Sequence, residues 1–299
     1  METVADSVAR VRTHLLGSYR VIINRLTTTV DQNDSSIELD WTQNSIQRGQ
    51  VLALGTEEML VWSYSPGTRT ATVERGWNDT HAATHQAGTL VEVNPRYPAS
   101  AVAQAIKDEV HGWPETMFRV VTQTYTVTAS QRTVPVPQAF EEAYGIVRAL
   151  SWAAADIDVD LASLPDQRKA VRLRRGVHDA LSGTHTALYL SGWPSTETKL
   201  QIAYALPFDL SGAVLTTDLQ DQGIPMSAND LVGIGAALRL MAGADAQRID
   251  PQAQGQTRIV QEVPVGSGVR GMQPLAVLRT QRLAEESSKL TSRWGVPFS

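Results

Sequence analysis

The spacing of apolar residues alternates between a helical and a strand period along this chain, which limits the folds open to it. In residues 3–28, apolar side chains recur every three or four positions, from Val4 to Leu26. This spacing predicts one amphipathic helix with a single apolar face. Gly17 weakens the middle of that helix by up to ~1 kcal/mol relative to alanine, and the polar run 31–36 ends it.

A first block of strand-like segments lies between residues 37 and 97. Its segments are short, rich in strand-forming residues and separated by turn signals such as Ser65-Pro66-Gly67. They cover residues 51–54, 59–64, 68–75 and 89–93. The pattern predicts a small antiparallel sheet whose strands are joined by hairpins.

A second helix is expected at about 100–112, within the segment 98–114. Ser100 fits its N-cap, and Gly112-Trp113-Pro114 fits its end. Residues 117–208 then contain regularly spaced strand candidates with turn signals between them, which predicts an inserted β-sandwich. The candidates are 119–128, 133–137, 144–152, 169–177, 186–191 and 199–206.

The helical period returns in residues 227–299. Ser227 or Asp230 fits the N-cap of a helix whose apolar stripe begins at Leu231, and a last helix is expected at about 271–293. None of the expected helices has a pattern strong enough to be stable alone. We therefore expect an α+β fold: a core bundle of about four helices, the first within 1–30, that carries the small antiparallel β-sheet and the inserted β-sandwich.

Composition narrows the classes of function. The chain has no cysteine, which removes disulfides, thiolate metal sites and cysteine nucleophiles. Its formal net charge is −5, whereas a bulk nucleic-acid binder is usually basic. No run approaches the ~18 apolar residues of a membrane span, and residues 1–6 lack the basic region and apolar core of a signal peptide. We expect a soluble protein with no membrane contact.

His81 and His85 are four residues apart, the spacing of two zinc ligands on one helix face. Ala82, however, stands where a general-base glutamate would be, so two loop histidines are the better interpretation. Asp156, Asp158 and Asp160 could hold Ca²⁺, or form a solvated acidic loop.

Gly233-Ile234-Gly235 resembles part of a dinucleotide-binding motif. It lies inside a helical stripe rather than after a strand, so it predicts close packing between helices. We expect no catalytic residue, metal or other cofactor.

The most specific local signal is the segment 73–91. A strand ends in Arg-Gly, a loop crosses over, and Ala-Gly leads into the next strand. This arrangement resembles a loop in neck and tail proteins of tailed phages, with matches at Arg75, Gly76, Thr80, His85, Ala87 and Gly88. Asp79 replaces the usual glycine, so the turn there is expected to differ.

The resemblance continues in order along most of the chain, at 13–18, 93–98, 233–240, 261–266 and 278–286. These segments resemble head-to-tail connector (adaptor) proteins of tailed bacteriophages, especially the actinobacterial siphophage type. The segment 117–208 contributes least. The resemblance implies a non-enzymatic virion protein at the head–tail junction, assembled in the host cytoplasm.

The same resemblance implies a ring of this chain, commonly of twelve copies, below the portal protein. The ring would extend the DNA channel, with DNA passing through its lumen without specific binding. It would offer a platform to the next neck or tail protein, a stopper or tail terminator.

The segment 270–299 is locally basic, with four Arg and one Lys against two Glu. An acidic portal surface would attract it. We expect contacts to the portal or a neighbouring subunit from Arg279, Arg282, Arg293, Trp294 and Phe298. The alternative is a frayed tail on a solvated helix.

Two other functions stay open. One is a different virion part, such as a tail-completion or baseplate protein whose β-sandwich binds carbohydrate or protein. The other is a hydrolase that uses His81 and His85.

Overall fold

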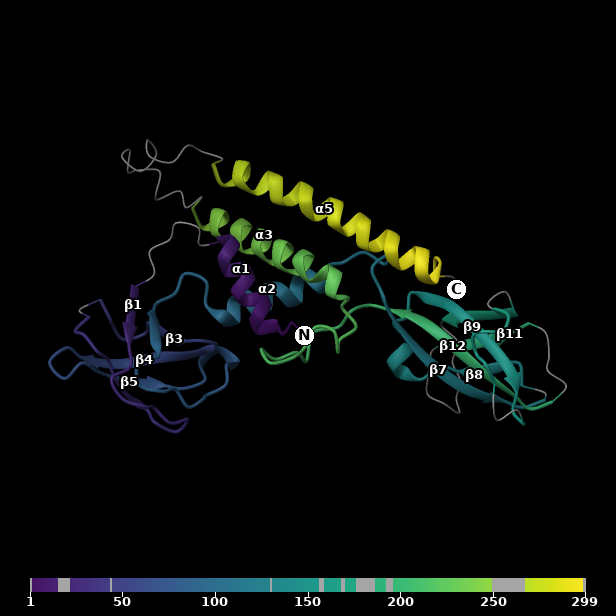
Figure 1. Ribbon diagram of the computed structural model, residues 1–299, viewed down its shortest axis with the longest axis horizontal. Coiled ribbons are helices and arrows are strands. Elements are labelled where there is room, and N and C mark those ends of the chain that lie inside the picture. The colour runs from purple at the N-terminus through teal and green to yellow at the C-terminus, as the bar shows by residue number, and fades with distance from the viewer. Residues whose placement is uncertain are drawn as a thin grey trace. The chain divides into compact units, whose positions relative to one another are not determined.

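A computed structural model describes most of the chain in a mixed α+β fold (Figure 1). The described residues are 2–15, 22–43, 45–129, 131–155, 159–167, 170–175, 186–191, 196–248 and 267–297. They fall into two compact units. The first comprises Met1–Glu109, Ser211–Gln220 and Asn229–Arg279, and the second comprises Val110–Leu210, Asp221–Ala228 and Thr280–Ser299. Within the described residues, no helix combines the length and the apolar character needed to span a bilayer.

The first helix is shorter than its sequence pattern predicts. Helix α1 (Val4–Leu15) begins after Thr3, whose side chain and backbone exchange hydrogen bonds with Asp6 in a capping arrangement. The prediction of one helix over 3–28 is wrong, because Ile22–Arg25 forms strand β1. The β-branched pair Ile22-Ile23 suits a strand, and pairing with another strand overrides the helical spacing.

A curled six-stranded antiparallel sheet follows, with strand order β1-β6-β3-β4-β5-β2. Its remaining strands are β2 (Ser36–Glu38), β3 (Val51–Leu54), β4 (Glu57–Ser65), β5 (Thr70–Glu74) and β6 (Leu90–Val93). An antiparallel bridge between Leu26 and Leu39 joins the ends of the two outer strands, so the sheet curls into a half-barrel. Its inner side chains, among them Leu52, Met59 and Val91, form one buried core.

The helices of the first unit pack closely. Figure 1 shows α1 beside α3 (Asn229–Arg248), and α3 also packs against α2 (Ala99–His111). A Cβ added at Gly235 of α3 would lie 2.1 Å from the Glu109 carboxyl carbon of α2, closer than atoms approach. The expected close packing at this glycine is therefore confirmed. Helix α3 begins at Asn229, between the two expected capping residues Ser227 and Asp230.

The second unit contains two three-stranded antiparallel sheets, ordered β7-β12-β9 and β10-β11-β8. The strands are β7 (Arg119–Val127), β8 (Thr133–Pro135), β9 (Gly145–Ala153), β10 (Val171–Arg175), β11 (Thr186–Leu190) and β12 (Thr198–Leu206). Each overlaps a strand expected from the sequence.

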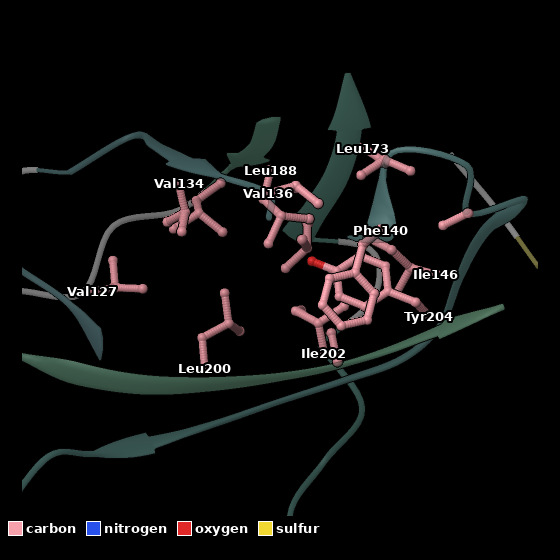
Figure 2. Close-up of a cluster of buried hydrophobic side chains, with 14 of the residues drawn as sticks. Val127, Val134, Val136, Phe140, Ile146, Leu173, Leu188, Leu200, Ile202 and Tyr204 are labelled. Atoms are coloured by element: carbon pink, nitrogen blue, oxygen red, sulfur yellow. The ribbon is translucent and has the colours of Figure 1, made fainter. Parts of the chain in front are cut away.

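Both of these sheets contribute side chains to one buried cluster (Figure 2). The Phe140 ring stacks on Tyr204 with centroids 4.8 Å apart. The Tyr204 hydroxyl is 2.8 Å from that of Tyr125, which satisfies a polar group inside the core. Burial raises the pKa of Tyr204 far above its ordinary value, so the phenol stays neutral.

Candidate functional site

Two consecutive glutamates at the start of β4 are the most buried charged side chains of the first sheet. Glu57 is 1% exposed and Glu58 is 0% exposed. Successive side chains of a strand point to opposite faces, so the two carboxylates meet different surroundings. An isolated buried carboxylate is strongly unfavourable, so each should be surrounded by donors.

Glu57 is held by the two ends of the loop between β5 and β6. Arg75 places Nε 2.6 Å from Oε1 and Nη2 2.9 Å from Oε2, a bidentate pair. His85 Nε2 lies 2.7 Å from Oε2, and the backbone N–H of Ala83 donates to the same oxygen at 3.0 Å. This one carboxylate therefore joins both ends of the loop to the sheet.

Arg75 also fastens the surrounding backbone. Its guanidinium donates to the carbonyl oxygens of Asp31, Asp34 and Ala83 as well as to Glu57. Only 8% of the Arg75 side chain is exposed. A lysine could not reproduce this planar set of donors, because its ammonium is a single compact charge.

Glu58 instead holds the first turn of α2. Ser100 donates to it twice, from its backbone N–H at 2.7 Å and from its hydroxyl at 2.9 Å. Asn78 donates its side-chain amide to the same carboxylate at 2.9 Å. A negative charge at a helix N-terminus is favourable, since the first N–H groups lack partners within the helix. The expected cap by Ser100 is corrected: α2 begins at Ala99, and the cap is supplied by Glu58.

The loop needs unusual backbone angles between its two anchors. Gly76 has φ +63°, and a Cβ there would lie 2.9 Å from the Thr80 carbonyl oxygen. Asp79, which replaces the glycine of the resembling loop, has φ +58°. Aspartate tolerates this left-handed conformation better than most residues, so Asp79 fits the turn that the loop makes here.

The geometry makes Glu57 an anchor rather than a proton donor. Burial alone would raise the pKa of Glu57, but hydrogen bonds from Arg75, Ala83 and His85 outweigh burial and hold the pKa below its ordinary value. The carboxylate stays ionised, and both of its oxygens are taken by donors of the chain. Its described contacts therefore connect the sheet to the loop.

The two histidines of the loop lie in different environments. His85 is bound to Glu57, whereas His81 is exposed, and residues 81–84 are not helical. The helical zinc-ligand spacing therefore does not arise. Among the described residues, no three His, Cys, Asp or Glu side chains are grouped as a metal site would require. Asp160 accepts a hydrogen bond from the Ala162 N–H within its own turn, while Asp156 and Asp158 lie outside the described residues.

A third buried carboxylate, Glu109 of α2, joins three helices of the first unit. Arg239 of α3 places Nε 2.9 Å from one carboxylate oxygen, and Arg279 of α5 (Ser267–Trp294) places Nε 2.6 Å from the other. The Glu109 side chain is 2% exposed. Arg279, expected at the portal, is thus already engaged within its own chain.

Arg282 is also paired, in the second unit. It interacts with Glu285 and with the buried Glu286, and donates to the Ser227 carbonyl oxygen at 2.8 Å. Glu286 also accepts hydrogen bonds from the Ser227 hydroxyl and from Lys289. Burial raises the pKa of Glu286, but the bonds from Lys289 and Ser227 outweigh burial, so the pKa lies below its ordinary value.

The three remaining expected contact residues differ in their surroundings. Trp294 and Leu290 pack against an apolar cluster of Phe118, Val147, Ala203 and Ala205 in the second unit. Arg293 is exposed, and its guanidinium lies 5.4 Å from the centre of the Trp294 ring. Phe298 lies outside the described residues. Contact of these residues with a portal stays a prediction.

Sequence patterns assigned no role to the glutamates that are buried among the described residues, Glu57, Glu58, Glu109 and Glu286. One feature of the sequence could have indicated a role for two of them. Glu57-Glu58 lies between the apolar segments 51–54 and 59–64, where a buried charge would need a partner. The partners are far apart in the sequence, so spacing could not identify them.

No model of a known protein family matches the chain, and no curated protein matches it. The function therefore has to be inferred from the residues and their geometry.

Proposed function

We propose that the chain is a structural subunit of a tailed-phage virion, a head-to-tail adaptor whose copies form a ring below the portal. One observation carries the proposal. Four residues of the connector-like loop lie together around Glu57 and Glu58. They are Arg75, Gly76, Thr80 and His85. A chance match of single letters would not be expected to converge on one cluster. Because the four matching residues meet in one cluster, they support a resemblance to connector proteins in structure as well as in sequence.

The finer architecture proposed is a helical bundle with two β insertions. The order of elements supports it, since the curled sheet lies between α1 and α2, and β7–β12 lie between α2 and α3. The common core of the two three-stranded sheets supports a β-sandwich as the second insertion.

In this proposal the chain works mechanically, without catalysis or a cofactor. Twelve copies are the expected number, and DNA passes through the lumen without specific binding. The portal lies on one side of the ring and a stopper or tail terminator on the other. Of the five expected contact residues, Arg293 fits best, because its charged side chain is exposed while Arg279 and Arg282 already pair within the chain.

The proposal is tested by mixing the purified full chain with the portal ring of the same virus and imaging the product by negative-stain electron microscopy. We expect a second ring stacked on the portal. Antibodies against the chain should also decorate virions at the head–tail junction. Decoration at the distal tail tip would instead identify a baseplate component, and the absence of both a portal complex and virion decoration would refute the adaptor.

A further inference from the structure

One sheet of the second unit has a basic outer face. In the sheet ordered β10-β11-β8, the inner side chains Val134, Leu173 and Leu188 belong to the buried cluster (Figure 2). Successive side chains of a strand point to opposite faces. Arg172 and Arg174 of β10 therefore point away from the cluster, and both are exposed. The outer face of this sheet carries two guanidinium groups.

An aromatic ring lies beside these two arginines. Tyr189 of β11 is paired with Arg172 in the strand register, which places both side chains on the same face. The Arg174 guanidinium lies 4.5 Å from the centre of the Tyr189 ring, an arrangement that stabilises a cation. The ring therefore limits the freedom of the Arg174 side chain. We call Arg172, Arg174 and Tyr189 the β10 face.

The positive charge of the β10 face is not neutralised within the described residues. No described carboxylate forms an ion pair with Arg172 or Arg174, and strands β8, β10 and β11 contain no acidic residue. Asp166, the nearest acidic residue before β10, accepts a hydrogen bond from the backbone N–H of Ala149 in the other sheet. The segment 168–175 has five basic residues and no acidic one, on a chain whose net charge is −5. This segment is the place where the chain could attract an anionic partner.

The composition of the face favours nucleic acid over protein as that partner. A protein interface has an apolar centre, but none of the large aliphatic side chains of these three strands is exposed. Interfaces with nucleic acid are more polar and much more positively charged. A guanidinium can form two parallel hydrogen bonds with one phosphate. Arg172 and Arg174, at alternate positions of one strand, present two such groups side by side.

We propose that the β10 face binds the phosphodiester backbone of nucleic acid without reading its base sequence. Contacts to phosphates position a protein on nucleic acid and carry no sequence information directly. The adjacent Arg175 is not included, because its guanidinium donates to the carbonyl oxygens of Ala143 and Tyr144 within the chain. The inference goes beyond the proposed ring, which needs no contact with DNA.

The test is fluorescence anisotropy of the full chain with a labelled DNA single strand and a labelled DNA duplex, each in two unrelated sequences. We expect both sequences of each form to bind with equal affinity. Affinity should fall as salt rises, since phosphate contacts release counterions. Two contacts predict a slope of log K against log salt of about −1.5 to −2.

Variants of the β10 face locate the binding site. Arg172→Glu and Arg174→Glu should each weaken binding by about tenfold, because each replaces an attraction to phosphate by a repulsion. Arg172→Gln should reduce the salt slope by about 1, whereas Arg172→Lys keeps the charge and should keep the slope. Both arginines are exposed, and urea unfolding checks that each variant is as stable as wild type.

Arg25→Glu is the matched control. It reverses an exposed charge on β1, in the first unit, and changes the net charge by the same amount as Arg172→Glu. Its affinity for DNA should stay within about twofold of wild type, since salt screens charges that lie far from the bound strand. Equal losses for the two variants would overturn the β10 face as the binding site.

The remaining outcomes also decide the proposal. A wild-type chain that binds neither form of DNA at low salt overturns it, and so does unchanged binding by both arginine reversals. Polyglutamate and vesicles of phosphatidylglycerol and phosphatidylcholine test other anions, and binding to either as tight as to DNA would overturn nucleic acid as the partner. A chain that stacks on its portal ring but binds no DNA keeps the adaptor proposal and loses this one. Binding of DNA without a portal complex gives the reverse result.

Discussion

At the scale of single residues, buried carboxylates join segments of the chain that are far apart in the sequence. Glu57 receives donors from a strand end, a loop and a histidine, and its side chain is almost fully enclosed. Removing one partner of such a cluster is costly, because the remaining charges stay buried without compensation.

Glu57→Gln is therefore expected to lower the free energy of unfolding by about 3–5 kcal/mol. Urea unfolding followed by circular dichroism measures it. Glu74→Gln, on an exposed side chain of the same sheet, is the matched control and should change stability by less than about 1 kcal/mol. Equal stability of both variants would mean that Glu57 is not an anchor.

The same carboxylate predicts how stability depends on pH. The pKa of Glu57 lies below its ordinary value of 4.5 in the folded chain. The unfolded chain therefore binds the proton first as pH falls, and the stabilisation present above pH 4.5 is lost as pH falls through the lower, folded pKa. Urea midpoints measured between pH 6 and pH 3 should fall steeply for wild type and less steeply for Glu57→Gln. Parallel curves would contradict the prediction.

At the scale of elements, most strands were predictable and the first helix was not. The strands of residues 117–208 have local signals, alternation and turns, and each lies where expected. The helical spacing of 3–28 is also a local signal. Residues Ile22–Arg25 nevertheless form a strand, because they pair with β6, which lies about 70 residues away in the sequence. The four buried glutamates were missed for the same reason, since their partners come together only in the folded chain.

The contact between α2 and α3 depends on a glycine. A Cβ at Gly235 would collide with the Glu109 carboxyl group, which Arg239 and Arg279 hold in place. Gly235→Ala should destabilise the chain by about 1–3 kcal/mol, despite alanine's better helix propensity.

Gly233→Ala is the matched control within α3. Its Cβ would lie 3.2 Å from the flexible Arg10 side chain, which can move aside. It should be neutral or stabilise the chain by up to about 1 kcal/mol. Thermal unfolding of the two variants would give this order, and the reverse order would show that Glu109 does not fix the helix spacing.

At the scale of the whole molecule, the basic C-terminal segment contains residues that pack within the chain and residues that are exposed. Trp294 and Leu290 cover an apolar cluster of the second unit, so part of the expected docking tail contributes to the chain's own stability. Val296 is 70% exposed and, like Arg293, is available to a partner. Removing residues 294–299 would therefore confuse loss of stability with loss of binding.

A deletion of residues 296–299 separates the two. It keeps Trp294 in place, so the free energy of unfolding should change by less than about 0.5 kcal/mol, while affinity for the portal ring should fall at least about tenfold if the tail docks there. Trp294→Ala should instead lower stability by about 1–3 kcal/mol, since it removes a half-buried aromatic side chain. Urea unfolding and surface plasmon resonance on immobilised portal rings give the two readouts. If neither the deletion nor Arg293→Glu changes the affinity for the portal ring, the docking site does not lie in this segment. Its helix then has only the role of packing within the chain.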